Sequence, residues 1–598
     1  MLRDLAPLFR YMRRYRRGYV WGALTCIATN LVTVQFPYVL GIAIDDLKKG
    51  SSRERIFLFA CLLVGIYLVR GIFLYAQRWI LIGISRKIEF DLRNDLFSKL
   101  ETQDTGFYER YRTGDIMARM TNDLSAVRMV LGPGLMYSFN TVVLSVFALV
   151  FMLHISPYLT LCALAPMPFA SIVVQYFGHR IHERFERIQA SFSDISAQAQ
   201  ENYSGARLVR AFAREESEIN LFERLNRQYV GRALRLVQLM GMLWPTIEFI
   251  LGISMMITLL VGGHLVLAHR ISVGEFVAFN TYMILLTFPI IAIGWVLNIF
   301  QRGTASLKRI DELLHSEPAI NDDRAAEFPL GPDYAMQGEI EFRHLRFSYG
   351  DAPALHPTNQ KPSAGIPVLR DVSLRIPARS SLAIVGPTGS GKSTLVNLLP
   401  RLYEAPEGSI LIDGRPLREY PLAVLRRNIG MVPQETFLFS ETIRENISFG
   451  APDAGAEEML AAADAAQIRR EFEEFPHGFE TIIGERGVTL SGGQKQRSAI
   501  ARALLRRPAI LILDDALASV DTDTEERILN NLGVYTANCT TILISHRIST
   551  VRHADQIAVL ERGRIVELGR HEELLALDGY YADLYRKQQL EEELTVAS

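Results

Sequence analysis

Six predominantly apolar runs, each of about 20 residues, constrain the fold of this chain more than any other feature of its sequence. Wound as a helix, a run of that length crosses the roughly 30 Å of hydrocarbon in a lipid bilayer. The arginines ahead of the first run also suit a cleavable signal peptide, but that run is long and lacks an obvious small-residue cleavage site, which favours a retained helix. We therefore expect six membrane-spanning helices, at residues 19–40, 56–82, 131–154, 157–177, 243–267 and 273–299.

The placement of Lys and Arg predicts the orientation of these helices. The positive-inside rule puts both termini, and the long segments between spans two and three and between spans four and five, in the cytosol of a cell bounded by a plasma or inner membrane. Lys48, Lys49, Arg53 and Arg55 oppose this orientation but are outnumbered. The two segments carry Arg86, Lys87, Arg93, Lys99, Arg110, Arg112, Arg119 and Arg128, and Arg180, Arg184, Arg187, Arg207, Arg210, Arg214, Arg224, Arg227, Arg232 and Arg235.

Both arginine-rich segments are predicted to continue the spans as helices. Residues 83–103 and 178–235 keep a helical apolar spacing with few breakers. Thr105–Tyr108 and Arg112–Asp115 are expected to break the first pattern at a helix-turn-helix tip, and Ser204–Arg207 lies near the second tip. Each tip is either an ordinary surface turn or a docking site for the second half of the chain, and we favour docking.

Composition and isolated charges narrow the function further. Lys and Arg total 64 and Asp and Glu total 65, so the net charge of −1 does not indicate a nucleic-acid partner. The four cysteines form no CxxC pair, which argues against a disulfide framework or a zinc site. Arg70 and Glu248 lie inside predicted spans, where an ionisable residue either lines a substrate cavity or packs against another helix or snorkels.

The second half of the chain reads as a soluble α/β domain with a phosphate-binding loop. The apolar run Ser381–Val385 leads into Gly386-Pro-Thr-Gly-Ser-Gly391-Lys392-Ser393, which matches G-x-x-x-x-G-K-S/T between a strand and a helix. The glycines let backbone N–H groups face a phosphate, Lys392 would reach the β- and γ-phosphates, and Ser393 would bind Mg²⁺. The expected nucleotide contacts are Gly386, Pro387, Thr388, Gly389, Ser390, Gly391, Lys392, Ser393 and Thr394.

A second strand is expected to end in two acidic residues. Ala509–Leu513 is apolar and is followed by Asp514 and Asp515. Doubly wound sheets bind ligands at the carboxyl ends of their strands, so Asp514 would support Mg²⁺ there. A capped strand end is the alternative, which the accompanying phosphate loop disfavours.

Leu490-Ser491-Gly492-Gly493-Gln494 lies between these two motifs. This order of motifs resembles the ATP-binding-cassette superfamily, and six spans fused to one cassette resemble a half-transporter of the exporter type. The resemblance covers nearly the whole chain and is specific, because LSGGQ is diagnostic of the family. It implies an all-α membrane domain of six long helices at residues 1–310, a linker at 311–336, an α/β P-loop ATPase domain at 337–588 and a tail at 589–598.

The resemblance also implies roles for residues that match the family in order. Tyr349 resembles the aromatic residue that stacks on adenine, and Gln434 resembles the lid glutamine that contacts Mg²⁺ and the membrane domain. Asp521 ends the D-loop, and His546 resembles the switch histidine that contacts the γ-phosphate. Gly484-Glu485-Arg486-Gly487 resembles the exporter motif that meets the coupling helices.

Family membership would also imply a dimer. Two cassettes close head to tail, and each ATP lies between the phosphate loop of one and the Ser491, Gly492, Gly493 and Gln494 of the other. One chain therefore holds half of each site and implies a second half-transporter as partner.

Asp515 departs from the family pattern, which usually has Glu directly after the Mg²⁺-binding aspartate. Asp is one methylene shorter, so its carboxylate stops about an ångström short, and such a misplacement can cost roughly 10²-fold. LDDALxxVD resembles the impaired-site subunit of heterodimeric multidrug-type exporters; the alternative is a homodimer in which Asp515 acts slowly. A second departure is the Pro-rich stretch at residues 350–366, which reads as a surface insertion.

The expected function is ATP-driven transport with ATP and Mg²⁺ as cofactors. The apolar spans contain few charges, which favours export of hydrophobic drugs or lipids over ions or sugars. A regulatory, mostly non-hydrolysing subunit and a nucleotide-gated channel are the alternatives. The six fused spans exclude a soluble cassette ATPase, and we expect membrane lipid and no nucleic acid among the partners.

Overall fold

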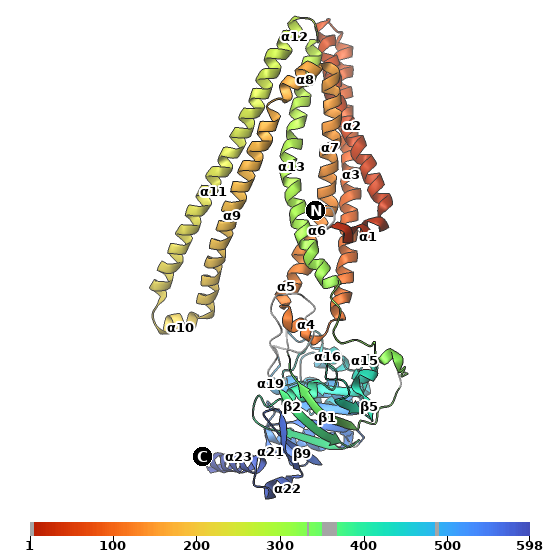
Figure 1. Ribbon diagram of the computed structural model, residues 1–598, viewed down its shortest axis with the longest axis vertical. Helices are drawn as coiled ribbons and strands as arrows, with labels where there is room; N and C mark the ends of the chain where they lie inside the picture. Colours follow the sequence, from red (N-terminus) through yellow and green to blue (C-terminus); the bar gives the residue numbers. More distant parts are fainter. Residues whose placement is uncertain (1–4, 332–333, 350–366, 485–489, 537, 598) are drawn as a thin grey trace. The chain divides into compact units, whose positions relative to one another are not determined.

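The computed structural model describes residues 5–331, 334–349, 367–484, 490–536 and 538–597 (Figure 1). The chain divides into a helical unit, Met1–Glu101 with Thr113–His315, and an α/β unit, Thr102–Arg112 with Ser316–Ser598. The predicted insertion at 350–366 and Glu485–Gly487 of the predicted exporter motif lie outside the described residues.

Six helices of the helical unit are long and apolar enough to cross a membrane, and each contains one predicted span, which confirms that prediction. They are Arg16–Lys48, Arg53–Glu101, Thr113–Ile155, Pro157–Ser204, Glu215–Leu267 and Val273–Leu314. The helices of the unit are α1 (Ala6–Arg14), α2 (Arg16–Lys48), α3 (Arg53–Glu101), α5 (Thr113–Ala118), α6 (Leu124–Met129), α7 (Leu135–Ile155), α8 (Pro157–Leu164), α9 (Met167–Ser204), α10 (Ala206–Ala211), α11 (Glu215–Ile257), α12 (Gly263–Leu267) and α13 (Val273–Leu314), with π-helical turns at Arg119–Asp123, Val130–Gly134 and Thr258–Gly262. Of these, α1 and α10 lie outside the six long helices.

Polar contacts between helices hold α2, α7 and α13 together. The buried Tyr282 hydroxyl on α13 donates to the Val34 carbonyl oxygen on α2 over 2.7 Å. Asn30 on α2 donates to the Asn140 side chain on α7 over 2.6 Å. At the far end of α2, the Asp45 carboxylate accepts from the backbone N–H of Gly274 over 2.7 Å. Partners of this kind are needed because lipid offers no hydrogen bonds in place of water.

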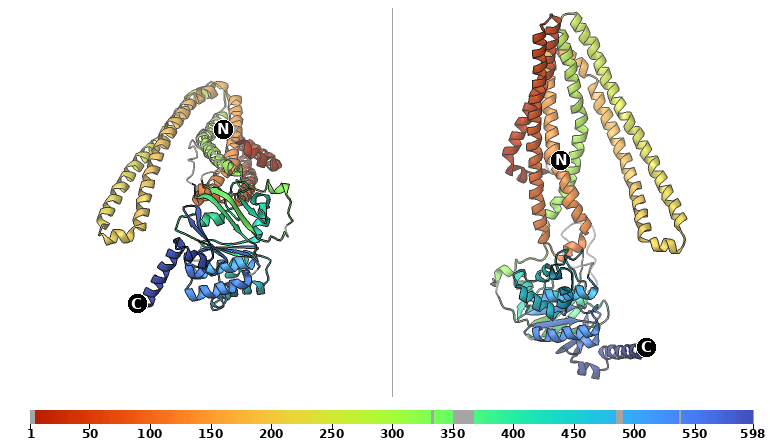
Figure 2. Two further views of the ribbon diagram at one scale, coloured as in Figure 1. Left: turned by 60° about the horizontal axis from the view of Figure 1, so that its bottom comes forward. Right: turned by 180° about the vertical axis from the view of Figure 1, so that it is seen from behind.

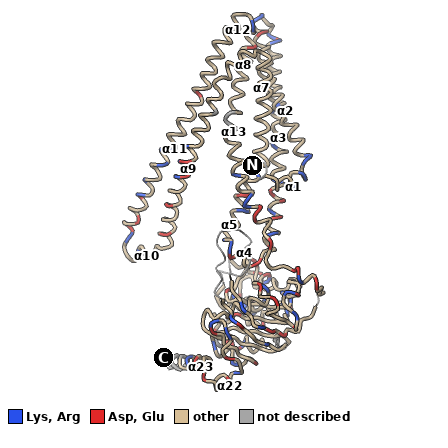
Figure 3. Tube along the Cα trace, viewed as in Figure 1, with Lys and Arg blue, Asp and Glu red and all other residues tan. Residues whose placement is uncertain are grey.

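The helices α9 and α11 run side by side and diverge from the other long helices of the unit (Figures 1 and 2). Gln198 on α9 donates to Glu218 on α11 over 2.8 Å, and Arg184 donates to the Arg235 carbonyl oxygen over 2.5 Å. Charged residues gather toward the α10 end of this pair, and the opposite end is largely uncharged (Figure 3). The predicted continuation of these spans as polar helices is therefore confirmed.

The first predicted tip differs from the expectation in one respect. Thr105–Tyr108 does not break the helical pattern but begins the short helix α4 (Thr105–Arg110), because the Asp104 side chain caps it by accepting from the Phe107 N–H over 2.9 Å. The other oxygen of Asp104 accepts from the Ala319 N–H over 2.8 Å, and the Tyr403 hydroxyl donates to Glu109. These contacts attach α4 to the rest of the α/β unit, as the docking interpretation expected.

Two sheets form the α/β unit. An antiparallel sheet has the order β2-β1-β4-β5, and a six-stranded sheet has the order β10-β9-β3-β8-β7-β6, in which only β10 is antiparallel to its neighbour. The strands are β1 (Ile340–Phe347), β2 (Leu369–Ile376), β3 (Ser381–Val385), β4 (Ile410–Ile412), β5 (Arg415–Pro416), β6 (Ile429–Val432), β7 (Ile510–Asp514), β8 (Thr540–Ile544), β9 (Gln556–Glu561) and β10 (Arg564–Gly569).

The parallel strands of the six-stranded sheet are largely buried on both faces, whereas none of the β10 residues is buried. Leu382 and Ile384 of β3 pack in one core with the antiparallel sheet, and the intervening Ala383 and Val385 pack in another with the helices. Burial on both faces explains why β3 and β7 are continuous apolar runs instead of alternating ones. The helices are α14 (Lys392–Asn397), α15 (Leu422–Asn428), α16 (Ile443–Ser448), α17 (Ala456–Ala465), α18 (Arg469–Glu473), α19 (Gly492–Leu505), α20 (Thr522–Thr536), α21 (Ile548–Val551), α22 (His571–Ala576) and α23 (Tyr580–Ala597).

The close approach of α2 and α13 gives a test of the membrane fold. A Cβ on Gly274 would collide with the Gly41 carbonyl oxygen and the Asp45 carboxylate, whereas a Cβ on Gly71 of α3 would meet nothing within 4 Å. We expect Gly274→Ala to destabilise the protein by about 1–3 kcal/mol, as overpacking does. Gly71→Ala should be neutral or stabilising by up to about 1 kcal/mol, because alanine favours the helix. Thermal unfolding in detergent measures both, and equal melting temperatures would contradict the packing described.

Candidate functional site

Four neighbouring parallel strands deliver most of the predicted site residues to one edge of the six-stranded sheet. The strand order β3-β8-β7-β6 puts the phosphate loop after β3, His546 after β8, Asp514 and Asp515 at the end of β7, and Gln434 after β6. Residues from all four strand ends line a cavity of about 220 Å³. The predicted residues that line it are Thr388, Gly389, Gly391, Lys392, Ser393, Thr394, Gln434, Asp514, Asp515 and His546.

The loop folds tightly around the ammonium group of Lys392. Gly386, Gly389 and Gly391 have φ angles of +150°, +79° and +103°, which glycine adopts without strain. The buried Lys392 Nζ donates to the carbonyl oxygens of Gly386 and Pro387 over 2.9 and 3.0 Å. Burial lowers the pKa of Lys392, and the nearby charges of Asp514 and Asp515 oppose that shift.

Asp514 is buried at the end of β7 and accepts a hydrogen bond from Ser393. Burial raises the pKa of this carboxyl; the Ser393 hydrogen bond and the charges of Lys392 and His546 oppose the rise, and Asp515 adds to it. Asp515 itself has a φ of +49°, and its N–H donates to the Ile544 carbonyl oxygen over 3.0 Å.

These groups fit a metal-bound nucleotide phosphate. The Ser390 hydroxyl in the loop is buried and has no hydrogen-bond partner among the described residues, so the loop carries polar capacity that its own fold does not use. The Ser393 hydroxyl, the Asp514 carboxylate and the Gln434 amide supply the oxygen ligands that Mg²⁺ prefers.

Tyr349 lies beside the cavity and is the last residue of the described range 334–349. Its hydroxyl shares a hydrogen bond of 2.8 Å with the cavity-lining Thr394. Its ring meets that of Tyr403 edge to face, with the centroids 5.0 Å apart. The expected contact with adenine stays a prediction.

The signature residues lie at a second place in the α/β unit, the start of α19. Ser491 caps α19 through a reciprocal capping box, in which its hydroxyl accepts from the Gln494 N–H and its N–H donates to the Gln494 side chain. Gly492 and Gly493 form the first turn and approach Ser519. Asp521 accepts from the Thr524 N–H over 2.9 Å, which lowers the pKa of its carboxyl.

Sequence motifs did not identify Glu471, which supports the signature from α18. Its carboxylate accepts from the Gln494 amide over 3.1 Å and from both terminal nitrogens of Arg497 over 2.6 and 3.0 Å. The sequence motifs also did not identify Tyr403, whose ring contacts that of Tyr349 and whose hydroxyl donates to Glu109. Both act across long stretches of sequence, and neither belongs to a spacing pattern that would have revealed it.

Comparison with known proteins agrees with this geometry. Residues 20–290 match the family described as ABC transporter transmembrane region, and residues 369–518 match the family described as ABC transporter. The chain is 36% identical to a probable multidrug resistance ABC transporter ATP-binding/permease protein, YheI, of Bacillus subtilis, over 99% of this chain and 98% of that one. It is 35% identical to an ATP-dependent lipid A-core flippase of Syntrophus aciditrophicus, over 97% and 94% of the two chains.

A solved structure of a bacterial Atm1-family ABC exporter with ATP bound is also similar. It superposes with a TM-score of 0.76 at 28% sequence identity, and the match covers 96% of this chain and 98% of that one.

The contacts of Glu471 predict a kinetic effect. Glu471→Gln keeps the size of the side chain but weakens its bonds to Gln494 and Arg497, and hydrogen bonds to charged groups are worth about 1.5–3 kcal/mol. Because Glu471 is partly exposed, we expect a smaller loss, about fivefold to tenfold in the turnover number for ATP measured in an Asp515→Glu background, in which the longer carboxylate supports turnover, with unchanged equilibrium binding of ATP.

Glu473→Gln is the matched control, because Glu473 lies on the same helix and pairs with Arg469 at the surface. Steady-state ATPase kinetics and equilibrium nucleotide binding measure the two effects. Equal turnover in the two variants would show that Glu471 does not support the signature.

Proposed function

This chain belongs to the ABC transporter family, and on that premise we propose that it works with a second half-transporter to export hydrophobic compounds, drugs or lipids. Its fused membrane and nucleotide-binding regions make it a half-transporter of the exporter type and a multi-pass membrane protein that couples ATP hydrolysis to transport. Six long apolar helices fused to a cassette with a formed phosphate site are the observation that carries the proposal.

At the nucleotide site, Lys392 and the backbone of Gly386 to Thr394 bind the phosphates of ATP. Ser393, Asp514 and Gln434 would hold Mg²⁺, which would supply positive charge to offset that of the phosphates. Asp515 orients the attacking water, His546 contacts the γ-phosphate, and Tyr349 contacts adenine. The shared cavity supports the first two assignments, since Asp515 and His546 both line it.

The partner completes the site. Ser491, Gly492, Gly493 and Gln494, with Asp521 nearby, present the start of α19 to the ATP held by the other half-transporter. The α9–α11 pair supports this arrangement, because its connecting helix α10 has no buried residue in the single chain. Large apolar side chains beyond the predicted spans of the pair are exposed as well, among them Tyr203, Leu208 and Ile219.

Asp515 favours a heterodimer in which this subunit has the weaker catalytic site. The chain would bind ATP at its own site and lend its signature to a partner that carries the longer glutamate. A homodimer that uses Asp515 as the catalytic carboxylate is the second candidate. A regulatory or channel-like subunit has Asp515 as its only support.

The substrate class and orientation rest on relatives and on charge. Two relatives are named a multidrug resistance transporter and a lipid A-core flippase, which supports a hydrophobic or lipid substrate. Glu248 is exposed in the single chain, and the guanidinium of Arg70 lies over the ring of Tyr67. Neither observation supports a role for these residues in lining a substrate cavity. The arginine-rich helical extensions support a location in the cell membrane, with the cassette and both termini in the cytosol.

Restoring the longer carboxylate tests the weak-site proposal. We expect the purified wild type in lipid to hydrolyse Mg-ATP near background. Asp515→Glu should gain up to about 10²-fold, because the carboxylate then reaches the attacking water. Asp515→Asn is the control that removes the charge and should stay inactive. Robust wild-type turnover would contradict the weak site and favour the homodimer.

Complementation tests whether the sites are shared between chains. In the Asp515→Glu background, Lys392→Ala disables the phosphate loop and Ser491→Arg disables the signature. Each variant alone should be inactive, while dimers of the two variants contain one intact composite site, so co-expression should restore ATP turnover. If both variants are folded and dimeric but their co-expression restores no ATP turnover, the result would contradict a site built from two chains.

A further inference from the structure

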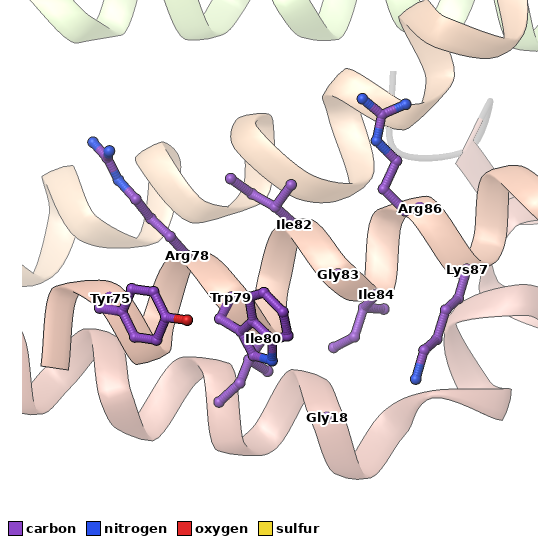
Figure 4. Close-up of a pocket in the computed structure, with 10 residues that line it drawn as sticks. All are labelled: Gly18, Tyr75, Arg78, Trp79, Ile80, Ile82, Gly83, Ile84, Arg86 and Lys87. Carbon is purple, nitrogen blue, oxygen red and sulfur yellow. The ribbon is translucent and has the colours of Figure 1, made fainter. Parts of the chain in front are cut away.

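A groove between α2 and α3 lies where the predicted span 56–82 gives way to charged sequence. Its volume is about 670 Å³, and ten residues of these two helices line it (Figure 4). Trp79, Ile80, Ile84 and Lys87 project from α3 toward the side on which Gly18 of α2 lies, whereas Arg78, Ile82 and Arg86 project from the other side of α3.

Two glycines shape this groove. Gly18 lets α2 approach α3 closely, because a Cβ there would lie 2.6 Å from the Ile84 side chain. Gly83 leaves a gap in the row Tyr75, Trp79, Gly83 and Lys87, whose members recur every fourth residue on one face of α3. A Cβ at Gly83 would meet nothing within 4 Å, so the gap is open space.

Exposed aromatic rings form one end of the groove. Tyr75 and Trp79 stack with their centroids 6.1 Å apart, and their side chains are 67% and 72% exposed. In water such a pair would be costly to expose, whereas Trp and Tyr are favoured at the boundary between hydrocarbon and lipid headgroups. The aromatic pair therefore indicates that lipid faces this part of α3.

The ammonium group of Lys87, at the other end of the groove, is available to a ligand. Lys87 has no carboxylate within 4 Å among the described residues, whereas its neighbour Arg86 pairs with Glu89 over 2.9 Å. The amphipathic helix α1 lies close by, since Tyr11 donates to Asp95 on α3 over 2.6 Å and Arg14 pairs with Asp91. Arg14 offsets the charge of Asp91, one turn beyond Lys87 on α3, and the Lys87 ammonium lies beside an apolar wall.

We propose that this groove binds one anionic phospholipid, whose phosphate contacts Lys87 and whose acyl chain lies in the gap at Gly83 against Trp79 and Ile84. The charge and the apolar wall are complementary to a headgroup and a chain, respectively, and basic residues near the surface attract anionic lipid. The lipid belongs to the cytosolic leaflet, an assignment that rests on the orientation proposed above.

Trp79 itself provides the probe. In a variant with Trp21→Phe, Trp244→Phe and Trp295→Phe, the fluorescence of Trp79 is measured in phosphatidylcholine bilayers that contain increasing mole fractions of brominated phosphatidylglycerol or of brominated phosphatidylcholine. We expect the brominated anionic lipid to quench at about fivefold lower mole fraction, which is the effect of one basic residue near a membrane surface.

Paired variants separate charge from shape. Lys87→Gln should abolish the preference, and Lys308→Gln, an exposed lysine of α13, should not. Gly83→Leu fills the gap and should also abolish it, whereas Gly71→Leu, equally unobstructed on the same helix, should not.

Several results would overturn the proposal. Equal quenching by the two lipids would show that the groove does not select anionic lipid. Quenching by neither would show that protein covers Trp79, as a second copy of the chain would. If the single-tryptophan variant does not fold, native mass spectrometry of the wild-type and Lys87→Gln proteins after exchange into an equimolar lipid mixture replaces it. Loss of bound phosphatidylglycerol in the variant is then expected, and equal retention overturns the proposal whether or not the protein transports.

Discussion

The parallel pairing of β3, β8, β7 and β6 is the constraint on which the nucleotide site depends. Parallel strands end at the same edge, so residues more than a hundred positions apart in the sequence meet there. Lys392 and Asp514 then lie near one another in a buried setting, where each offsets part of the other's desolvation. Removing either charge would leave the other buried with less compensation, so both belong to one electrostatic unit.

The same chain leaves two surfaces that its own fold does not complete. Ser491 and Gly492 at the start of α19 are exposed and do not line the cavity, and α10 buries none of its side chains. Exposed apolar residues beyond the predicted spans of α9 and α11, such as Tyr203 and Ile219, add to this, because proteins rarely leave large apolar patches uncovered outside lipid. The family's pairing of half-transporters therefore has a physical counterpart in this subunit.

Local patterns made much of this architecture predictable. The six spans are contiguous in sequence, and the phosphate loop is a short motif with glycines at the positions that have positive φ, such as Gly389 and Gly391. Contacts across long separations were not predictable. Glu471 meets Gln494 across 23 residues, and Tyr403 meets Glu109 across 294, with no periodicity to mark either pair. The helix α4 was missed for a local reason, since a single aspartate cap overrides the glycine in its first turn.

Those unpredicted contacts join the cavity to α4. Thr394 lines the cavity and shares a hydrogen bond with Tyr349, whose ring meets that of Tyr403, whose hydroxyl donates to Glu109. Burial raises the pKa of Tyr403, and its hydrogen bond to the carboxylate adds to that rise, so the hydroxyl keeps its proton and remains a donor at any physiological pH. A displacement of Thr394 on nucleotide binding thus has a continuous set of packed and hydrogen-bonded neighbours through which to act on α4. Energetic coupling along these contacts requires that α4 respond when either tyrosine contact is removed.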